Sequence, residues 1–286
     1  MSRYLDPKTD LTFKRVFGEH KDLMISFLNA MLPLEDGKDV VDIEYLEPEM
    51  IPLNPGKKDS IVDVRCKDTM GRQFIVEMQL YWTNAFRKRA LLNTCKAYSM
   101  QADKGMAFSD LKSVYTLNII NDTAFDDEEY YRVFVPTSNA KKMDKINDFV
   151  MIFVELPKFK PASESEKKMK RLWLRFLTEI KDQTTEVSRE LLDEEHLLKA
   201  IEILEESAYT PGQLLAYDKY WDMVSRERTT MEEKYQQGHD AGRIEGREEG
   251  RIEERIKNAK ELKRVGVPIE TIANALNLDI EEVNGL

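Results

Sequence analysis

The chain has 286 residues, of which 42% are hydrophobic, so it is long and apolar enough for one substantial domain plus an accessory region. No apolar run approaches the ~20 residues that span a bilayer. The N-terminus also lacks a hydrophobic signal region. Only Cys66 and Cys95 are present, so we expect a cytoplasmic protein without membrane association and without a cysteine-built zinc site. The net charge of -10 does not favour DNA binding, because phosphate contact needs local positive charge.

The first predicted element is a helix that Thr9 or Asp10 caps, that begins near Leu11 and that ends before Pro33. Asp10 and Lys14 lie four residues apart on it. They either border an active cleft or form an ordinary surface pair, and for Lys14 we favour the surface pair.

Residues 40–50 are expected to form a first strand, and residues 54–59 a turn. Lys58 lies in this turn, five residues before Asp63. It either reaches a metal site or a phosphate, or is a solvated loop lysine, which general exposure favours.

Residues 60–81 predict a β-hairpin, with Gly71 in the turn. Side chains alternate across a strand, so Glu77 and Gln79 point to the same face. If the hairpin folds about Met70, Asp63 lies opposite Glu77, and cross-strand partners are roughly 5 Å apart. Two carboxylates and an amide are therefore expected at one place.

Two carboxylates this close repel each other unless a cation lies between them. Hard oxygen ligands suit Mg²⁺ or Mn²⁺, which keep several waters and accept phosphate oxygens. The alternative is that Asp63 and Glu77 lie on a solvated sheet face, as is common in antiparallel sheets. The near-continuous apolar residues around them favour strands that are covered on both faces.

Residues 83–103 are predicted to form a second helix, with three consecutive cations, Arg87 to Arg89, in its first turns. Cations there oppose the helix dipole, so their clustering indicates phosphate contact or charge stabilisation. Lys96 and Tyr98 lie further along and either border the site or are packing and surface residues. Residues 60–104 contain eight Lys or Arg and four Asp or Glu, which makes this window the basic part of an acidic chain.

Three more strands are predicted at residues 111–120, 130–135 and 149–156. The order is then αβββαβ followed by added strands, which predicts an α/β fold with a mixed sheet. A Pro/Ser linker follows, and then helices at residues 166–181, 193–207 and 211–234. We therefore divide the chain into a core domain at residues 1–160, a helical bundle at 161–235 and a tail at 236–286.

The tail contains glycine at every fourth position from Gly238 to Gly250. Each glycine costs a helix roughly 1 kcal/mol relative to alanine. We expect this stripe to allow close helix–helix approach in a homodimer formed by the C-terminal helices. The alternative is a solvated, marginal helix or a flexible spacer. Residues 269–283 resemble the first part of a helix-turn-helix, but their acidic residues favour a packing element over a DNA reader.

Several motifs together resemble the PD-(D/E)xK nuclease superfamily, and within it the Rpn-type recombination-promoting nucleases, or nuclease-family transposases. The motifs are D-x-x-F-K-R-V-F-G (10–18), F-L-N-A-M-L (27–32), I-V-D-V (61–64), I-V-E-M-Q (75–79) and the helix residues Phe86, Arg89 and Tyr98. The resemblance covers roughly residues 5 to 155. It implies a restriction-endonuclease-like core and a Mg²⁺-dependent DNA endonuclease with a role in recombination, mobile elements or defence.

The resemblance also implies residue roles. Asp63, Glu77 and the backbone carbonyl of Met78 would bind the metal. Gln79 stands where the superfamily usually has lysine and would orient water or a phosphate oxygen. Lys58, Arg89 and Lys96 would contact nucleic acid.

The alternative is a catalytically inactive nuclease-fold module that binds DNA or a protein partner. The three histidines, His20, His196 and His239, are remote in sequence from the hairpin, which argues against histidine-based catalysis. No glycine-rich phosphate loop is present, so no nucleotide cofactor is expected.

Overall fold

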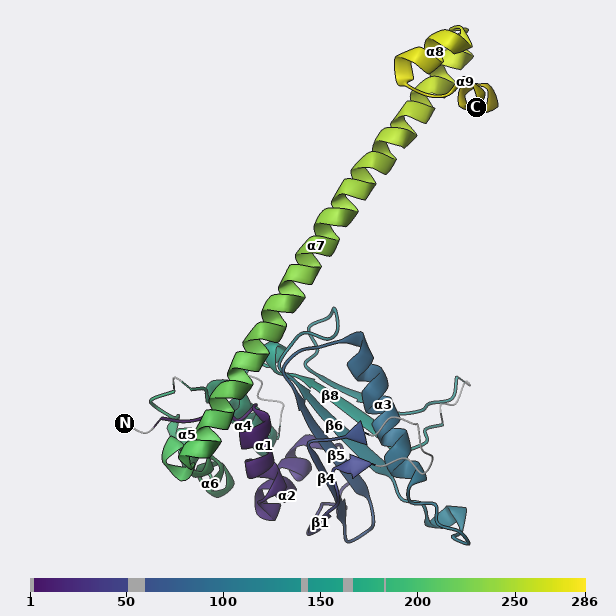
Figure 1. Cartoon of the computed structure of the whole chain (residues 1–286). Helices are drawn as coiled ribbons and strands as arrows, with labels where there is room; N and C mark the ends of the chain where they lie inside the picture. The colour runs from purple at the N-terminus through teal and green to yellow at the C-terminus, as the bar shows by residue number, and fades with distance from the viewer. Residues whose placement is uncertain (1–2, 51–59, 140–143, 162–166, 183) are drawn as a thin grey trace. The chain divides into compact units, whose positions relative to one another are not determined.

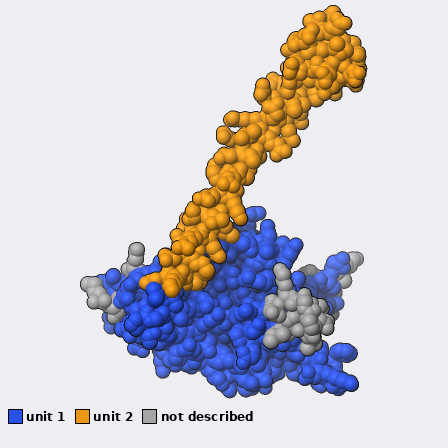
Figure 2. Space-filling model, viewed as in Figure 1, with its two compact units in different colours: residues 1–217 blue, residues 218–286 orange. Residues whose placement is uncertain are grey.

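The computed structural model describes residues 3–50, 60–139, 144–161, 167–182 and 184–286. The chain divides into two compact units, residues 1–217 and residues 218–286, which are coloured separately in Figure 2. No helix among the described residues is both long enough and apolar enough to cross a membrane.

A six-stranded sheet forms the centre of the first unit (Figure 1). In spatial order its strands are β1 (Ile43–Tyr45), β4 (Val64–Asp68), β5 (Gln73–Gln79), β6 (Val114–Ile120), β8 (Phe149–Glu155) and β7 (Tyr131–Phe134). Strands β5, β6 and β8 are parallel, whereas the β1–β4, β4–β5 and β7–β8 pairs are antiparallel. This mixed sheet with helices confirms the predicted α/β fold class.

The single strand predicted at residues 40–50 is wrong. The chain instead forms β1 and the short β2 (Glu49–Met50), which pairs with β3 (Ser60–Ile61) in a separate two-stranded sheet. Leu46 still donates its backbone N–H to the carbonyl of Arg65 at 2.8 Å. After that bond the backbone leaves the β4 ladder, so one continuous strand does not form.

The β4–β5 hairpin has the predicted turn. Gly71 has a φ of 80°, a conformation that glycine adopts without steric cost. Asp68 Oδ1 accepts hydrogen bonds from the backbone N–H groups of Met70 and Arg72, at 3.0 and 2.9 Å. Val64 pairs with Val76, and the residues just beyond this last pair of the ladder are Asp63 and Glu77. The turn therefore fixes the register that places these two acids opposite each other.

Helices cover both faces of the sheet (Figure 1). On one face, Phe74, Val76 and Met78 of β5 contribute to the main apolar core. The helices on this face are α1 (Asp10–Phe13), α2 (Lys21–Met31) and α4 (Lys168–Glu179). Helix α3 (Asn84–Ser99) covers the opposite face, where Ile75 packs against Ala97. Strand β5 is therefore buried on both sides, as its near-continuous apolar sequence predicted.

The single helix predicted between Leu11 and Leu32 is interrupted. After α1 the chain takes one π-helical turn (Lys14–Gly18), and α2 begins only at Lys21. Glycine is the least favourable helix residue after proline, and Gly18 lies at the break, against Val64 of the hairpin. The break matters because Asp10 and Lys14 lie on its N-terminal side, next to β4.

The remaining helices of the first unit are α5 (Arg189–Leu192), α6 (Glu195–Ile203) and the beginning of α7 (Pro211–Arg264). Short 3₁₀ turns lie at Phe108–Asp110, Leu156–Lys158 and Glu206–Ala208. Tyr217 is 2% exposed, and its hydroxyl accepts a hydrogen bond from the backbone N–H of Asp6 at 2.8 Å. This bond anchors the beginning of α7 to the N-terminal segment that leads into α1.

Helix α7 continues through the glycine repeat, so the chain there is a helix and not an irregular spacer. The second unit ends in α8 (Ile269–Leu276) and α9 (Ile280–Gly285), which pack with the end of α7. The core of this end comprises Ala259, Ile272, Ala273 and Val283. Lys263 Nζ donates to the carbonyl of Asn284 at 2.9 Å and so joins α7 to the C-terminus.

Candidate active site

Glu77 is a carboxylate in the middle of the sheet, and only 2% of its surface is exposed. Asn93 Nδ2 donates to Glu77 Oε1 at 2.8 Å, and Arg89 Nη2 lies 3.5 Å from Oε2. Gln79 Nε2 donates a longer bond of 3.4 Å to the same Oε2. Because Arg89 and Asn93 are four residues apart on α3, one face of that helix supplies both contacts.

Asp63 immediately precedes β4. Its Oδ2 accepts the backbone N–H of Met78 at 2.7 Å. This bond fixes the carboxylate beside the residue that follows Glu77 and engages one of its two oxygens. The hairpin therefore brings Asp63, Glu77 and Gln79 together.

Burial raises the pKa of both acids. It raises the pKa of Glu77 to about 7, and the negative charge of Asp63 adds to this, while Arg89, Asn93 and Gln79 act in the opposite direction. Burial also raises the pKa of Asp63 to about 6, against the lowering effect of the Met78 N–H. The neighbouring cations therefore do not fully compensate the two carboxylates, which is typical of a functional site.

Helix α1 and the turn after it bring a third acid and a second cation to the hairpin. Lys14 Nζ lies 2.6 Å from Asp10 Oδ1, in a pair with both side chains about half exposed. The charge of Asp10 raises the pKa of Asp63, whereas Lys14 and Arg89 lower it. Asp63 is therefore influenced by one cation from each of two elements, the turn after α1 and helix α3.

The residues present fit a hard divalent cation. Asn93 Oδ1 and Asn118 Oδ1 are buried and have no hydrogen-bond partner among the described residues, and Asn118 pairs in register with Glu77. Buried acceptors of this kind, beside two incompletely compensated carboxylates, suit a hydrated ion. Within the described ranges no group of three or more His, Cys, Asp or Glu side chains could hold a metal. Two carboxylates with several waters are nevertheless a usual Mg²⁺ environment.

The remaining predicted site residues are Lys58, Lys96 and Tyr98, and none of them has a described contact with Asp63 or Glu77. Lys58 lies outside the described residues. Lys96 Nζ donates to Ser60 Oγ at 2.6 Å, three residues before Asp63. Tyr98 packs on Phe149 with ring centroids 4.6 Å apart and belongs to an apolar cluster with Ile75, apart from the hydrogen bonds around Glu77.

Sequence reasoning missed two amide residues at this site, Asn93 and Asn118. The position of Asn93 carried a usable signal, because it follows Arg89 by four residues on a predicted helix. Asn118 is a polar residue in a mostly apolar strand, and both Asn93 and Asn118 are fully buried. The parallel β5–β6 pairing that brings Asn118 beside Glu77 is not encoded in either strand alone.

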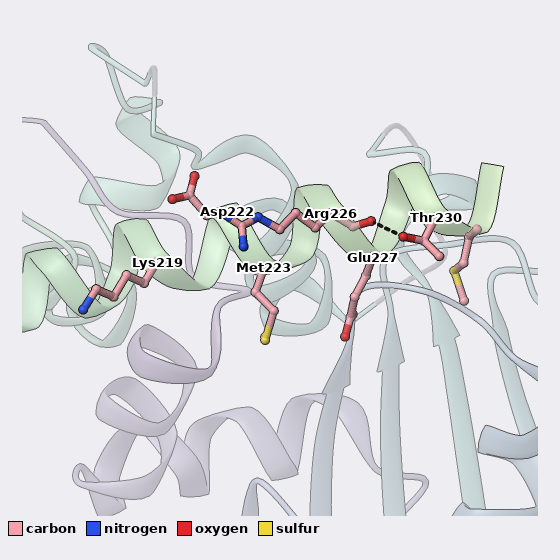
Figure 3. A pocket seen from close by; sticks show the side chains of 7 residues that line it. Lys219, Asp222, Met223, Arg226, Glu227 and Thr230 are labelled. Carbon is pink, nitrogen blue, oxygen red and sulfur yellow. Dashed lines mark hydrogen bonds between the residues drawn. The ribbon is translucent and has the colours of Figure 1, made fainter. Parts of the chain in front are cut away.

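A hollow of about 720 Å³ lies along α7, and no paired carboxylates among the described residues line it (Figure 3). The residues that line it lie between Lys219 and Met231 on one helix, where Thr230 Oγ1 donates to the carbonyl of Arg226 at 2.9 Å. Ligand sites are usually concave and enclosed by several elements. The hollow on α7 does not meet that description.

The mixed α/β sheet, with two acids at the end of the β4–β5 hairpin, is consistent with a PD-(D/E)XK nuclease fold. The family model for PD-(D/E)XK nuclease family transposases matches residues 7–233 of the 286 residues, and the chain belongs to this family. No curated protein and no solved structure matches the chain.

Proposed function

We propose that the protein is a divalent-metal-dependent DNA endonuclease that hydrolyses phosphodiester bonds. The observation that carries this proposal is the proximity of Asp63 and Glu77 at the end of the β4–β5 hairpin, where Met78 N–H binds Asp63 Oδ2 at 2.7 Å and Asn93 binds Glu77 at 2.8 Å. Family membership supports a nuclease. The metal, the DNA substrate and the endonucleolytic cut are our inference from this site.

Asp63, Glu77 and the backbone carbonyl of Met78 would hold Mg²⁺ or Mn²⁺. A divalent ion bound there would supply an activated water and neutralise charge on the phosphate. The Met78 N–H engages Asp63 Oδ2 and thereby leaves the second oxygen, Oδ1, for this purpose. Asn93 orients Glu77 from helix α3, so the carboxylate needs no reorganisation during the reaction.

The neutral and cationic side chains around the acids complete the proposed mechanism. Gln79 orients the attacking water or a phosphate oxygen. Arg89, which is half exposed and 3.5 Å from Glu77, stabilises charge that develops on the phosphate. Lys58 and Lys96 contact the DNA backbone. The exposed pair Asp10–Lys14 lies on the side of Asp63, whose charge it influences.

We also propose that the C-terminal helices form a homodimer. A Cβ added at Gly238, Gly242, Gly246 or Gly250 meets nothing within 4 Å among the described residues. No contact within the described chain therefore accounts for four helix-weakening glycines. A second copy packed along this stripe would account for them and would bring two nuclease domains to the two DNA strands.

Conversion of supercoiled plasmid to nicked or linear forms by the purified full-length protein tests the endonuclease. We expect cleavage with Mg²⁺ or Mn²⁺, none in EDTA, and none for Asp63→Ala or Glu77→Ala. Glu44→Ala is the matched control, because Glu44 is an exposed acid on β1 of the same sheet. Equal cleavage by wild type and the Asp63 and Glu77 variants would remove this site from the mechanism.

A second candidate function is a nuclease-fold module that binds DNA or a protein without cleaving it. Neutral Gln79 and the net charge of -10 favour it. DNA binding in EDTA together with no cleavage under any divalent metal would select this module over the enzyme.

A further inference from the structure

An apolar groove of about 410 Å³ lies on the α3 side of the sheet, separate from the paired acids. Leu91 and Cys95 line it from α3, Phe134 from β7, and Phe149 and Met151 from β8. Met151 belongs to the apolar cluster under α3 and pairs in register with Phe134, so both side chains point to the α3 face. Leu91 is 50% and Phe134 44% exposed, so an incoming group can reach the rim of this groove.

Two cations lie at one end of this groove. Arg87 precedes Leu91 by four residues and Lys88 precedes it by three, so both lie one helical turn away on the same face of α3. Both are exposed, and within the described ranges neither has a carboxylate partner within ion-pair distance. Arg89, the next residue, instead reaches Glu77. This end of α3 therefore carries positive charge one helical turn from the groove residue Leu91.

The size of the groove favours a small planar occupant over a protein. Stable protein interfaces bury about 800 Å² per partner. The groove is formed by a few residues, and its volume of about 410 Å³ falls at the lower end of the range of small-molecule pockets. Apolar walls with the exposed ring of Phe134 suit a nucleobase, because every base has a π-face that stacks on aromatic side chains.

We propose that this groove binds an unpaired nucleobase of the DNA, while Arg87 and Lys88 contact the phosphates of the same strand. A paired base is stacked on both faces inside the duplex and must leave the stack to enter. The inference rests on the proposed nuclease function and deepens it. The preferred substrate is DNA with a single-stranded segment, and recognition is tolerant of sequence because the lining is almost entirely apolar.

Binding in EDTA tests the groove without cleavage, with a fluorescein-labelled 12-nucleotide oligo(dT) and a blunt 12-base-pair duplex. We expect wild type to prefer the single strand. Phe134→Ala and Leu91→Ala should weaken single-strand binding by about 5- to 160-fold, the range for loss of one stacked base, and leave duplex binding unchanged. Phe134→Trp should retain binding. Phe108→Ala is the matched control, because Phe108 is 86% exposed and lies outside the groove.

Cys95 provides a direct readout in the wild-type protein. It is exposed in the groove, whereas Cys66 is fully buried, so a maleimide labels Cys95 first. We expect the single strand, but not the duplex, to slow this labelling. Unchanged labelling, or equal single-strand binding by Phe134→Ala and wild type, overturns the proposal. So does a change of oligomeric state in Phe134→Ala by light scattering, which would identify a protein contact instead.

These outcomes remain separate from the test of the nuclease. If single-strand binding depends on Phe134 but no metal supports cleavage, the nucleobase-binding proposal is supported and the nuclease proposal is rejected. If plasmid is cleaved normally and the groove variants bind both probes as wild type does, the nuclease proposal is supported and the nucleobase-binding proposal is rejected.

Discussion

The side-chain amide of Asn93 donates a hydrogen bond to Glu77 Oε1 at 2.8 Å, and this bond joins helix α3 to the strand that carries the carboxylate. Asn93 is fully buried, and its own Oδ1 has no partner among the described residues. A residue held in this way orients Glu77 without contacting substrate.

Asn93→Ala should therefore reduce metal-dependent cleavage by about 10- to 100-fold, the usual effect of losing a residue that orients a metal ligand. The reduction should be partly recovered at higher Mg²⁺, because the lost orientation weakens metal binding. Asn84→Ala is the matched control, since Asn84 is an exposed asparagine on the same helix. Cleavage rates measured against Mg²⁺ concentration decide this, and an unchanged metal dependence would contradict the orienting role.

The pKa values of the two acids predict a pH-dependent stability. Burial raises the pKa of Glu77 to about 7 and that of Asp63 to about 6. Both lie above the value of about 4 for an unfolded carboxyl. Between these values the folded state binds more protons, so the free energy of unfolding falls as the pH rises from about 4 through 7. Thermal unfolding in EDTA between pH 4.5 and 8 should show this decrease, and Glu77→Gln should reduce it.

Metal addition should reverse this decrease. A divalent ion binds the ionised carboxylates, so Mg²⁺ should raise the melting temperature more at pH 8 than at pH 5. Exposed ion pairs elsewhere are expected to respond little over this range. An equal shift at the two pH values, or an equal shift in Asp63→Ala, would place the binding site elsewhere.

Gln79 provides a test of the charge at the site. Its side chain is partly exposed and lies 3.4 Å from Glu77 Oε2. A lysine there would have two carboxylates as partners, so Gln79→Lys should fold normally and keep measurable cleavage. It should also lower the pKa of Glu77 and weaken the pH dependence of stability. Loss of activity together with a lower melting temperature would instead indicate a buried, unpaired charge.

The central hairpin was predictable because its rules are local. Strand alternation and the turn residues Asp68 to Gly71 are enough to place Asp63 opposite Glu77. The contact between Asn93 and Glu77 depends on how α3 docks on the sheet, and no local pattern encodes this. The interruption at Gly18 was also missed, because the apolar residues on either side of it continue at helical spacing.

The groove was missed for a similar reason. Leu91 and Cys95 resemble ordinary helix residues, and Phe134 belongs to a strand much later in the sequence. Only the spatial order of the sheet, with β7 beyond β8, brings them together. The apolar strands that the sequence predicted are present, but their order in the sheet depends on tertiary packing.

The glycine stripe predicts the oligomeric state. Four glycines at every fourth position weaken α7 by roughly 1 kcal/mol each, and an added Cβ at any of them meets nothing within 4 Å in the described chain. Gly242→Leu with Gly246→Leu should therefore raise the helicity of the isolated chain and sterically block a second copy. Gly212→Leu is the matched control, because Gly212 is on the same helix, has equally open surroundings and lies outside the stripe. Light scattering at tens of micromolar should give a dimer for wild type and the control and a monomer for the double variant. A monomeric wild type, or an equally dimeric double variant, would show that the stripe is not the interface.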